Sequence, residues 1–443
     1  MTVMFVTLSD FWAGLPTATQ DIATLVALLL PALIVGFVVT RRYRPLRLII
    51  AMAWRFRWTN ALFIALIAVS VGIGVGLIAQ ERGLRQGSAH AAAKFDLIVA
   101  APGSEVEMLL AAVFLQPTDV PLLDGETYDR IANHDNVALA APIAYGDSYR
   151  DSPVIGTTAG FVEHLSGKLV EGRVFAAHGE AVVGARVDLK MGETFEPAHG
   201  QGEAADHEAH AGHDYAVVGR MARSGSPWDR AILVPVESVW EVHGLATGHA
   251  AGHEEDIGPP FNSASFPGTP AILVRAKALW ANYALRSEFT TERTMAFFPG
   301  AVLARLHGLL GDVRQVMSVM AVLTQVLVTA GVLTGLVIVT RLYARRLALM
   351  RALGAPARFV FAVVWGYAAI LIGIGSALGV VFGLAASYAI SIIVAARTDI
   401  DVNPGLGWPE LHLVAAFVSL TLLLALLPAL AALRRPVIAD LRA

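Results

Sequence analysis

The sequence predicts an α-helical membrane protein with four core spans, an extra N-terminal span, and a large α/β domain inserted between core spans 1 and 2. Three observations predict this fold class. Hydrophobic residues make up 56% of the chain and charged residues only 16%, several apolar runs are as long as a membrane span, and a polar stretch over residues 80–300 separates two of them. A chain this poor in charge does not have the surface of an ordinary soluble protein.

The apolar runs predict where the spans lie. A helix needs about 20 apolar residues to cross a hydrocarbon core of about 30 Å. We expect an extra span within the N-terminal segment 1–44, and core spans at 60–79, within 301–340, at 359–395 and at 411–433. The corresponding runs are Ile22–Thr40, Asn60–Ala79, Val316–Val339, Phe359–Ala395 and Leu411–Leu433. The fourth run exceeds one crossing, so it must tilt, project from the bilayer or break near its glycines.

The distribution of Lys and Arg predicts the orientation. Residues 1–21 contain neither, whereas Arg41–Arg47, Arg341–Arg358 and the tail 434–443 are basic. Basic segments beside spans stay in the cytoplasm. We therefore expect the N-terminal tip, the inserted domain and the loop 396–410 on the outside. A cleaved signal peptide does not fit, because the charged flank follows the first apolar run instead of preceding it.

Residues 45–59 alternate apolar and cationic side chains and contain Trp54 and Trp58. This composition predicts an elbow helix in the membrane interface, with Trp at headgroup depth and Arg reaching the phosphates. A plain cytoplasmic linker is the alternative. In the span that follows, Gly72, Gly74 and Gly76 allow close helix contact, although glycine is common in membrane helices in any case.

The inserted domain has the pattern of a mixed α/β fold. Its expected strands are short, rich in β-branched residues and bounded by Gly, Pro or charged residues; they are Phe95–Ala100, Ala138–Ala144, Ala181–Leu189, Tyr215–Met221, Ala231–Val236 and Ala271–Val274. Helical periodicity is present at Glu126–Ala132 and Ala276–Glu288. Turns are expected at Gly146–Asp147, Ser152–Pro153 and Ser226–Pro227. The domain lacks a Ser-His-Asp order, a paired-carboxylate pattern and a GxxxxGK motif, so we expect no enzymatic site in it.

Two loops of the inserted domain are rich in histidine. The first contains His199, His207, His210 and His213 among Gly and Ala, and the second contains His243, His249 and His253; both also carry Asp and Glu. Zinc takes imidazole and carboxylate ligands at about 2.0–2.2 Å, and a flexible His-rich tract can supply several of them. The loops predict a zinc site made by these seven histidines. The alternative is a solvated loop whose histidines are incidental.

The chain after residue 294 becomes helical before it becomes apolar on all sides. One helix over Ala301–Met350 would be about 75 Å long, which exceeds one crossing and would make a stalk continuous with core span 2. An ordinary span with a hinge near Gly311 is the alternative. The segment 341–358, between core spans 2 and 3, is basic and amphipathic.

The motifs in this order resemble the MacB/LolC/FtsX class of ABC transporter permeases. The residues that carry the resemblance are Val182–Phe195, Ala296–Leu306, Met350–Val360 (MRALGAPARFV) and Arg434–Arg442. A narrower branch, with a His-rich exterior loop, is indicated by Lys94–Leu110, Ala140–Thr158 and Gly225–His243. The resemblance covers nearly the whole chain from Pro45 onward.

The resemblance implies a mechanism. Such permeases lie in the bacterial inner membrane with a periplasmic domain, pair as homodimers, and use ATP through a separate ATPase. The cytoplasmic segment 341–358 would dock on that ATPase through Arg345, Arg346, Arg351, Ala352, Leu353, Gly354, Ala355 and Pro356. Gly354 would end the helix in a left-handed cap, which Pro356 keeps from continuing. The chain itself has no Walker A motif. The alternative is that the arginines serve only topology and anionic lipid.

Two departures from the class concern partners and topology. Many members carry an acidic residue where Arg346 stands, so the ATPase surface facing it should be more acidic here. The extra span Ile22–Thr40 lies outside the common four-span plan.

Three functions follow as hypotheses. The first is a permease subunit that exports or extracts a hydrophobic, lipid-like, peptidic or metal-linked substrate. The second is an FtsX-like mechanotransmitter that regulates an envelope protein without transport. The third is a membrane-anchored zinc sensor. Expected partners are the ATPase, a second copy, membrane lipid and a periplasmic protein or lipoprotein; no nucleic acid is expected.

Overall fold

The computed structural model describes residues 12–199, 214–309 and 311–434. The chain divides into two compact units. The first, here the membrane unit, comprises Met1–Gly83, Gly311–Ser391 and Asn403–Ala443; the second, the exterior unit, comprises Leu84–Leu310 and Ile392–Val402. The predicted metal ligands His207, His210 and His213, and all but the first residue of the predicted tail 434–443, lie outside the described residues.

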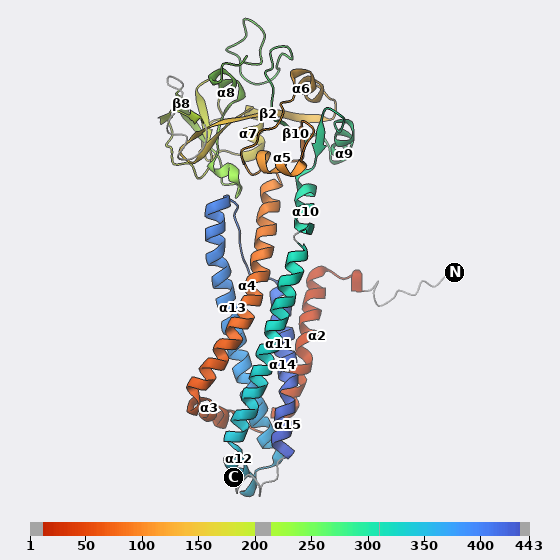
Figure 1. Cartoon of the computed structure of the whole chain (residues 1–443), viewed down its shortest axis with the longest axis vertical. Coiled ribbons are helices and arrows are strands. Elements are labelled where there is room, and N and C mark those ends of the chain that lie inside the picture. Colours follow the sequence, from red (N-terminus) through yellow and green to blue (C-terminus); the bar gives the residue numbers. More distant parts are fainter. Residues whose placement is uncertain (1–11, 200–213, 310, 435–443) are drawn as a thin grey trace, which may run out of the picture. The chain divides into compact units, whose positions relative to one another are not determined.

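The membrane unit is helical (Figure 1). Its helices are α2 (Thr17–Thr40), α3 (Leu46–Arg55), α4 (Arg57–Ala92), α11 (Gly311–Leu342), α12 (Ala344–Ala352), α13 (Ala357–Thr398), α14 (Trp408–Leu424) and α15 (Leu426–Arg434). Within the described ranges, five helical stretches are long and apolar enough to cross a membrane: Thr17–Thr40, Arg57–Ala92, Ser318–Leu342, Ala357–Thr398 and Trp408–Ala431. The predicted fold class, a helical membrane protein with an inserted α/β domain, is confirmed.

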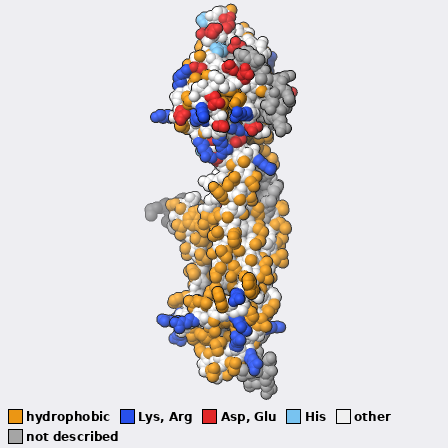
Figure 2. Space-filling model, turned by 90° about the vertical axis from the view of Figure 1, so that its left-hand side faces the viewer, with side chains coloured by type: hydrophobic (Ala, Val, Ile, Leu, Met, Phe, Trp, Pro, Cys, Tyr) orange, Lys and Arg blue, Asp and Glu red, His pale blue; other side chains and the backbone are white. Residues whose placement is uncertain are grey.

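The surface of the membrane unit matches a lipid environment. Figure 2 shows its hydrophobic side chains along the length of the helices, with Lys and Arg gathered toward the end that carries α3 and α12. The elbow helix α3 buries Ile49 and Met52 and leaves Trp54 exposed, an arrangement suited to a helix whose outer side meets headgroups.

Glycines bring α4 and α13 into backbone contact. A Cβ on Gly383 would lie 2.6 Å from the carbonyl oxygen of Gly72, and one on Gly76 would lie 3.2 Å from the carbonyl oxygen of Gly383. Such distances leave no room for a side chain, so the small residues permit this crossing. The glycines of α4 therefore serve close packing and are not merely frequent.

Several polar groups inside the membrane unit are paired. Tyr367 donates to Oδ1 of Asn60, and both Ser387 and Ser391 donate to Oε1 of Gln80 at 3.1 Å. The fully buried Glu410 lies 3.2 Å from Arg82. Pairing of this kind is what lets polar residues remain in an apolar surrounding.

The exterior unit is built on one mixed sheet. Its strands lie in the order β11 (Met295–Phe297), β1 (Leu97–Ala100), β10 (Ala271–Ala276), β2 (Val137–Tyr149), β3 (Ser152–Thr157), β9 (Ile232–Pro235), β5 (Glu180–Val183), β8 (Tyr215–Arg220) and β4 (Glu171–Gly172), with β6 (Thr194–Phe195) beside β8 and β7 (Ala198–His199) beside β2. Figure 1 shows β2 as the long central strand.

Helices cover both faces of the sheet, because the strand residues alternate between two cores. One core combines Ile98, Ile143 and Leu233 with α5 (Glu105–Ala112) and α7 (Ala159–Ser166). The other combines Leu97, Val99 and Ile232 with α6 (Gly125–Ala132), α8 (Val236–Val242) and α9 (Leu279–Glu288). A 3₁₀ turn at Pro227–Arg230 places the fully buried Trp228 in the first core.

Several predictions for the inserted domain need correction. The predicted strand Ala181–Leu189 ends at Val183, because a turn follows in which the amide of Val187 donates to the carbonyl of Gly184 at 3.2 Å. The expected turn at Ser152–Pro153 is the start of β3; Tyr149 pairs with Ser152, so the hairpin turn lies at Arg150–Asp151.

The stalk is not a single helix over 301–350. The structure has α10 (Pro299–Leu309) in the exterior unit, and α11 and α12 in the membrane unit. The break between α11 and α12 falls at Tyr343, whose buried ring packs edge-on against Phe56 with centroids 5.4 Å apart. Residue 310, between α10 and α11, lies outside the described residues, so the predicted hinge near Gly311 stays a prediction.

Candidate functional site

The predicted coupling segment is a short helix with a defined end. Its helix α12 stops at Ala352, and Gly354 follows in the left-handed region with φ +100°. The amide of Gly354 donates to the carbonyl of Arg351 at 3.0 Å, and the amide of Ala355 donates to that of Met350 at 2.9 Å. These two bonds are those of a Schellman cap. The LGAP motif thus turns the chain sharply before α13 begins at Ala357.

The coupling segment has an anchored side and an exposed side. Leu347 and Ala348 are buried in the membrane unit. The predicted docking residues lie mainly outward: Arg345, Arg346, Ala352, Leu353, Gly354 and Pro356 are exposed, and Arg351 and Ala355 are half-buried. Leu353 is the extreme case at 88% exposed. This end of the segment therefore presents an apolar side chain beside cations.

Arg346 has an internal contact in the membrane unit. Its guanidinium lies 5.6 Å from the ring centroid of Tyr343, within the range of a cation–π interaction. Arg346, where many members of the class carry an acidic residue, therefore stacks on Tyr343. Its side chain stays on the exposed side of the segment.

The structure separates the predicted metal ligands into different surroundings. His199 and His243 come together with Asp147, and the three donor atoms lie within 4.8 Å of one another. His249 is buried instead against Glu237, with 3.5 Å between Nε2 and Oε1, and burial raises the pKa of Glu237. His253 is exposed and pairs with Asp256 at 2.9 Å. The described part of the chain therefore does not hold these four histidines in one site.

Three elements build the carboxylate–histidine cluster (Asp147, His199 and His243). Asp147 lies on β2, directly opposite His199 of β7 in the antiparallel register. His243 follows the last residue of α8, and its Nδ1 lies 2.8 Å from the carbonyl of Val239. Because a carbonyl can only accept, Nδ1 carries the proton and Nε2 points toward Asp147, 3.6 Å from Oδ1.

A bulge in β2 aims Asp147 at the cluster. The register with β3 shifts between Ala144 and Asp147, and Gly146 has φ +151°. A Cβ on Gly146 would lie 3.2 Å from Nε2 of His243. The expected turn at Gly146–Asp147 is thus a bulge within a strand, a feature that often re-aims a side chain near functional sites. Sequence reasoning missed that Asp147 lies beside two histidines; its signal is an acid directly after a glycine in a mostly apolar strand.

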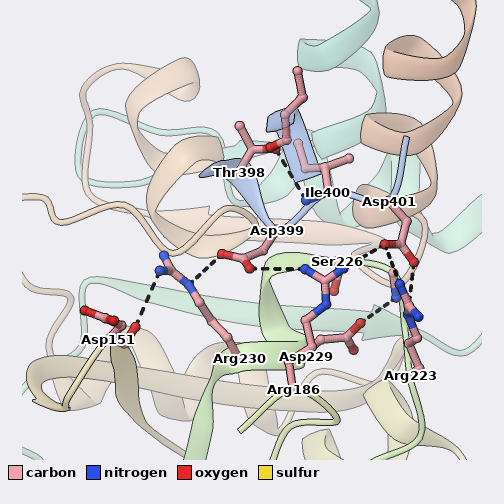
Figure 3. Close-up of polar contacts among 12 residues, drawn as sticks. Asp151, Arg186, Arg223, Ser226, Asp229, Arg230, Thr398, Asp399, Ile400 and Asp401 are labelled. Atoms are coloured by element: carbon pink, nitrogen blue, oxygen red, sulfur yellow. Dashed lines mark hydrogen bonds and ion pairs between the residues drawn. The ribbon is translucent and has the colours of Figure 1, made fainter. Parts of the chain in front are cut away.

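The loop after α13 carries two acids that meet three arginines of the exterior unit (Figure 3). Asp399 lies 3.3 Å from Arg186 and 2.9 Å from Arg230. Asp401 lies 2.9 Å from Arg186 and 2.8 Å from Arg223. The side chains of Ile400 and Val402 are buried in the core beneath. We call Asp399–Val402 the loop anchor.

A buried turn of the exterior unit receives the loop anchor. The fully buried Asp229 accepts hydrogen bonds from the amide of Ser224 at 2.7 Å and the amide of Gly225 at 2.8 Å. Gly225 has φ +70°, and its carbonyl accepts from the amide of Asp401 at 3.2 Å. A Cβ there would lie 3.2 Å from the Asp401 carboxylate, so glycine fits best at this position.

Comparison with known proteins supports a permease. Residues 318–437, which include α12, α13 and α14, match the family described as FtsX-like permease C-terminal. No curated protein matches the sequence. Among solved structures, the periplasmic region of MacB from Actinobacillus actinomycetemcomitans is similar over 48% of this chain and 95% of that one, with 8% identity and a TM-score of 0.32; a likeness this distant carries no argument about function.

The helices and the family match define a multi-pass helical membrane protein whose residues 318–437 are similar to the C-terminal part of FtsX-like permeases. Residues 318–437 match the FtsX-like permeases, which confirms the expected resemblance to the MacB/LolC/FtsX class.

Proposed function

We propose that the chain is the permease subunit of an ATP-driven, MacB-like ABC transporter of the bacterial inner membrane. A separate ATPase would dock on the coupling segment and move the exterior unit, which handles a hydrophobic, lipid-like, peptidic or metal-linked substrate. The working form would be a homodimer in contact with membrane lipid and with a periplasmic protein or lipoprotein. The observation that carries this proposal is the coupling segment: a capped helix between two spans, with an exposed leucine among arginines.

Helix continuity supports the transmission of movement. The helix α4 is uninterrupted from Arg57 to Ala92, and its last residues, Ala91 and Ala92, are buried in the core of the exterior unit. The helix α13 likewise runs without a break from the coupling segment to Thr398, directly before the loop anchor. A helix resists bending, so a displacement at one end is carried to the other.

The interior of the membrane unit supports a mechanism without a polar pore. In each candidate span, the most apolar window holds no more than two charged residues. Charged residues mark ion and polar-substrate pathways through membrane proteins. Their scarcity favours a substrate handled by the exterior unit, and equally an FtsX-like mechanotransmitter that moves this unit without transport.

Alanine substitution at two glycines tests the docking role of the coupling segment. The free-energy cost of the alanine backbone is similar at the two positions. Gly354 (φ +100°) and Gly192 (φ +77°) are both left-handed, and a Cβ on either would meet no atom within 4 Å. An alanine in this region costs about 1–2 kcal/mol at each site. We expect Gly354→Ala to lower the amount of ATPase that co-purifies from native membranes and Gly192→Ala to leave it unchanged. Equal retention in both variants would show that the segment does not dock.

Mass spectrometry of the same preparations separates transport from mechanotransmission. A transporter that handles lipid-like molecules should carry them at a fixed ratio to protein, and ATP should release them. A mechanotransmitter should retain an envelope protein instead and show no ATP-dependent release of a small molecule.

A further inference from the structure

We propose that Asp147, His199 and His243 of the exterior unit together bind one divalent transition-metal ion of the zinc type. This site is independent of the coupling function. It keeps two of the seven histidines expected from the sequence and adds a carboxylate. It does not require His207, His210 or His213, which lie outside the described residues.

The spacing of the donor atoms fits such an ion. Oδ1 of Asp147 lies 3.5 Å from Nδ1 of His199 and 3.6 Å from Nε2 of His243. Ligands at about 2.0–2.1 Å from a tetrahedral zinc lie about 3.3–3.4 Å from one another. Two edges of the tetrahedron are thus nearly formed. The third edge closes with a small shift of His199, whose side chain is on the surface.

The donor set favours zinc-type ions over the common hard cations. Two imidazoles and one carboxylate suit zinc and related transition metals. Calcium and magnesium select oxygen ligands instead. Three protein ligands also leave one coordination position open, as in sites that exchange a ligand, in contrast to closed structural sites with four.

The surroundings orient the ligands. The Nδ1 proton of His243 is held by the carbonyl of Val239, and a hydrogen bond of this kind to the second ring nitrogen is the usual companion of a metal-bound histidine. Asp147 is 3% exposed, so its carboxylate is held inside the fold and not on the open surface. The close approach of Gly146 to His243 keeps the carboxylate and the ring on the same side.

Zinc titration of the full chain tests the site. The chain is purified in detergent without a polyhistidine tag, stripped with a chelator, and titrated with Zn²⁺ by calorimetry. Asp147→Asn, His243→Gln and His199→Gln each remove one ligand with little change in shape, and each should weaken the tightest binding event at least tenfold. His253→Gln, which changes an exposed histidine outside the cluster, should titrate as the original chain does. Calcium should give no competing heat.

The coordination geometry gives a second readout. Co²⁺ in place of Zn²⁺ should show the strong visible absorption of a four-coordinate site, and Asp147→Asn should abolish it. The proposal is overturned if the original chain binds no Zn²⁺. It is also overturned if the ligand variants bind like the original chain while a variant with His207, His210 and His213 replaced loses binding. His199→Gln decides the matter if a buried-ligand variant fails to fold, because His199 is exposed.

Discussion

Asp401 holds Arg223 through both carboxylate oxygens, with Oδ1 2.8 Å from Nη2 and Oδ2 3.1 Å from Nε. The two residues are 178 positions apart in the chain. This bidentate pair, with the Asp399–Arg230 pair beside it (Figure 3), fixes the loop after α13 to the exterior unit. Bidentate geometry and a shared network are the conditions under which ion pairs near a surface contribute measurably.

Loss of the two carboxylates should release the loop anchor. In Asp399→Asn/Asp401→Asn, we expect amide hydrogen exchange at Ile400 and Asp401 to rise about tenfold, because the network contributes on the order of 1 kcal/mol. Co-purification of the ATPase should not change, since the coupling segment is intact. Asp256→Asn, which removes an exposed acid outside this network, is the control. Unchanged exchange at the anchor would mean that the buried Ile400 and Val402 hold the loop alone.

The α4–α13 contact should tolerate no side chain at its closest point. Gly383→Val places atoms against the backbone of Gly72, where even a Cβ would lie 2.6 Å from the carbonyl oxygen. Overpacking of this kind costs about 1–3 kcal/mol, so the midpoint of thermal unfolding in detergent should fall. Gly373→Val lies on the same helix with no atom within 4 Å of its Cβ, and its midpoint should stay near that of the original chain. Equal midpoints in the two variants would contradict the packing described.

The exterior unit should lose stability in acid through Glu180. Arg173 donates two hydrogen bonds to the carboxylate of Glu180, one of them from Nη1 to Oε2 at 2.7 Å. This ion pair lowers the pKa of Glu180 below its usual value of 4.5. The unfolded chain therefore takes up this proton first as the pH falls. The contribution of Glu180 is complete above about pH 4.5 and is lost as the pH falls toward the lowered pKa.

A substitution isolates that contribution. Glu180→Gln should be less stable than the original chain at pH 7, and the difference should shrink between pH 5 and 3, as followed by chemical unfolding with circular dichroism. Glu292→Gln, at an exposed glutamate, is the control. A difference that stays constant across this pH range would show that the Glu180 charge is not responsible.

The sequence predicted the features that depend on local pattern. Span length and the charge bias around Arg41–Arg47 and Arg341–Arg358 identified the membrane helices and the expected orientation. The LGAP turn was expected because a left-handed Gly354 followed by Pro356 leaves the helix few other ends. Short runs that are rich in β-branched residues and bounded by Gly, Pro or charged residues predicted most of the longer strands of the sheet, including the core of β2.

The sequence could not reveal contacts between distant segments. Arg186 and Asp401 are 215 positions apart, and no local pattern relates them. Gly146–Asp147 predicts a turn from the sequence, whereas the position of Asp147 depends on the bulge in β2 and on a register that brings His199 opposite. His243, His249 and His253 lie in one His-rich loop, and no local pattern distinguishes them. Tertiary packing places His249 beside Glu237 and leaves His253 exposed.

The central claim is that the coupling segment docks an ATPase, and Leu353 tests it most directly. This side chain is 88% exposed, so Leu353→Asp should leave the unfolding midpoint unchanged. Leu279 of α9 is 80% exposed, so Leu279→Asp makes the same chemical change on the exterior unit. The measurement is the ratio of ATPase to permease purified from native membranes. We predict at least a tenfold lower ratio for Leu353→Asp and an unchanged ratio for Leu279→Asp; a normal ratio for Leu353→Asp would contradict the account.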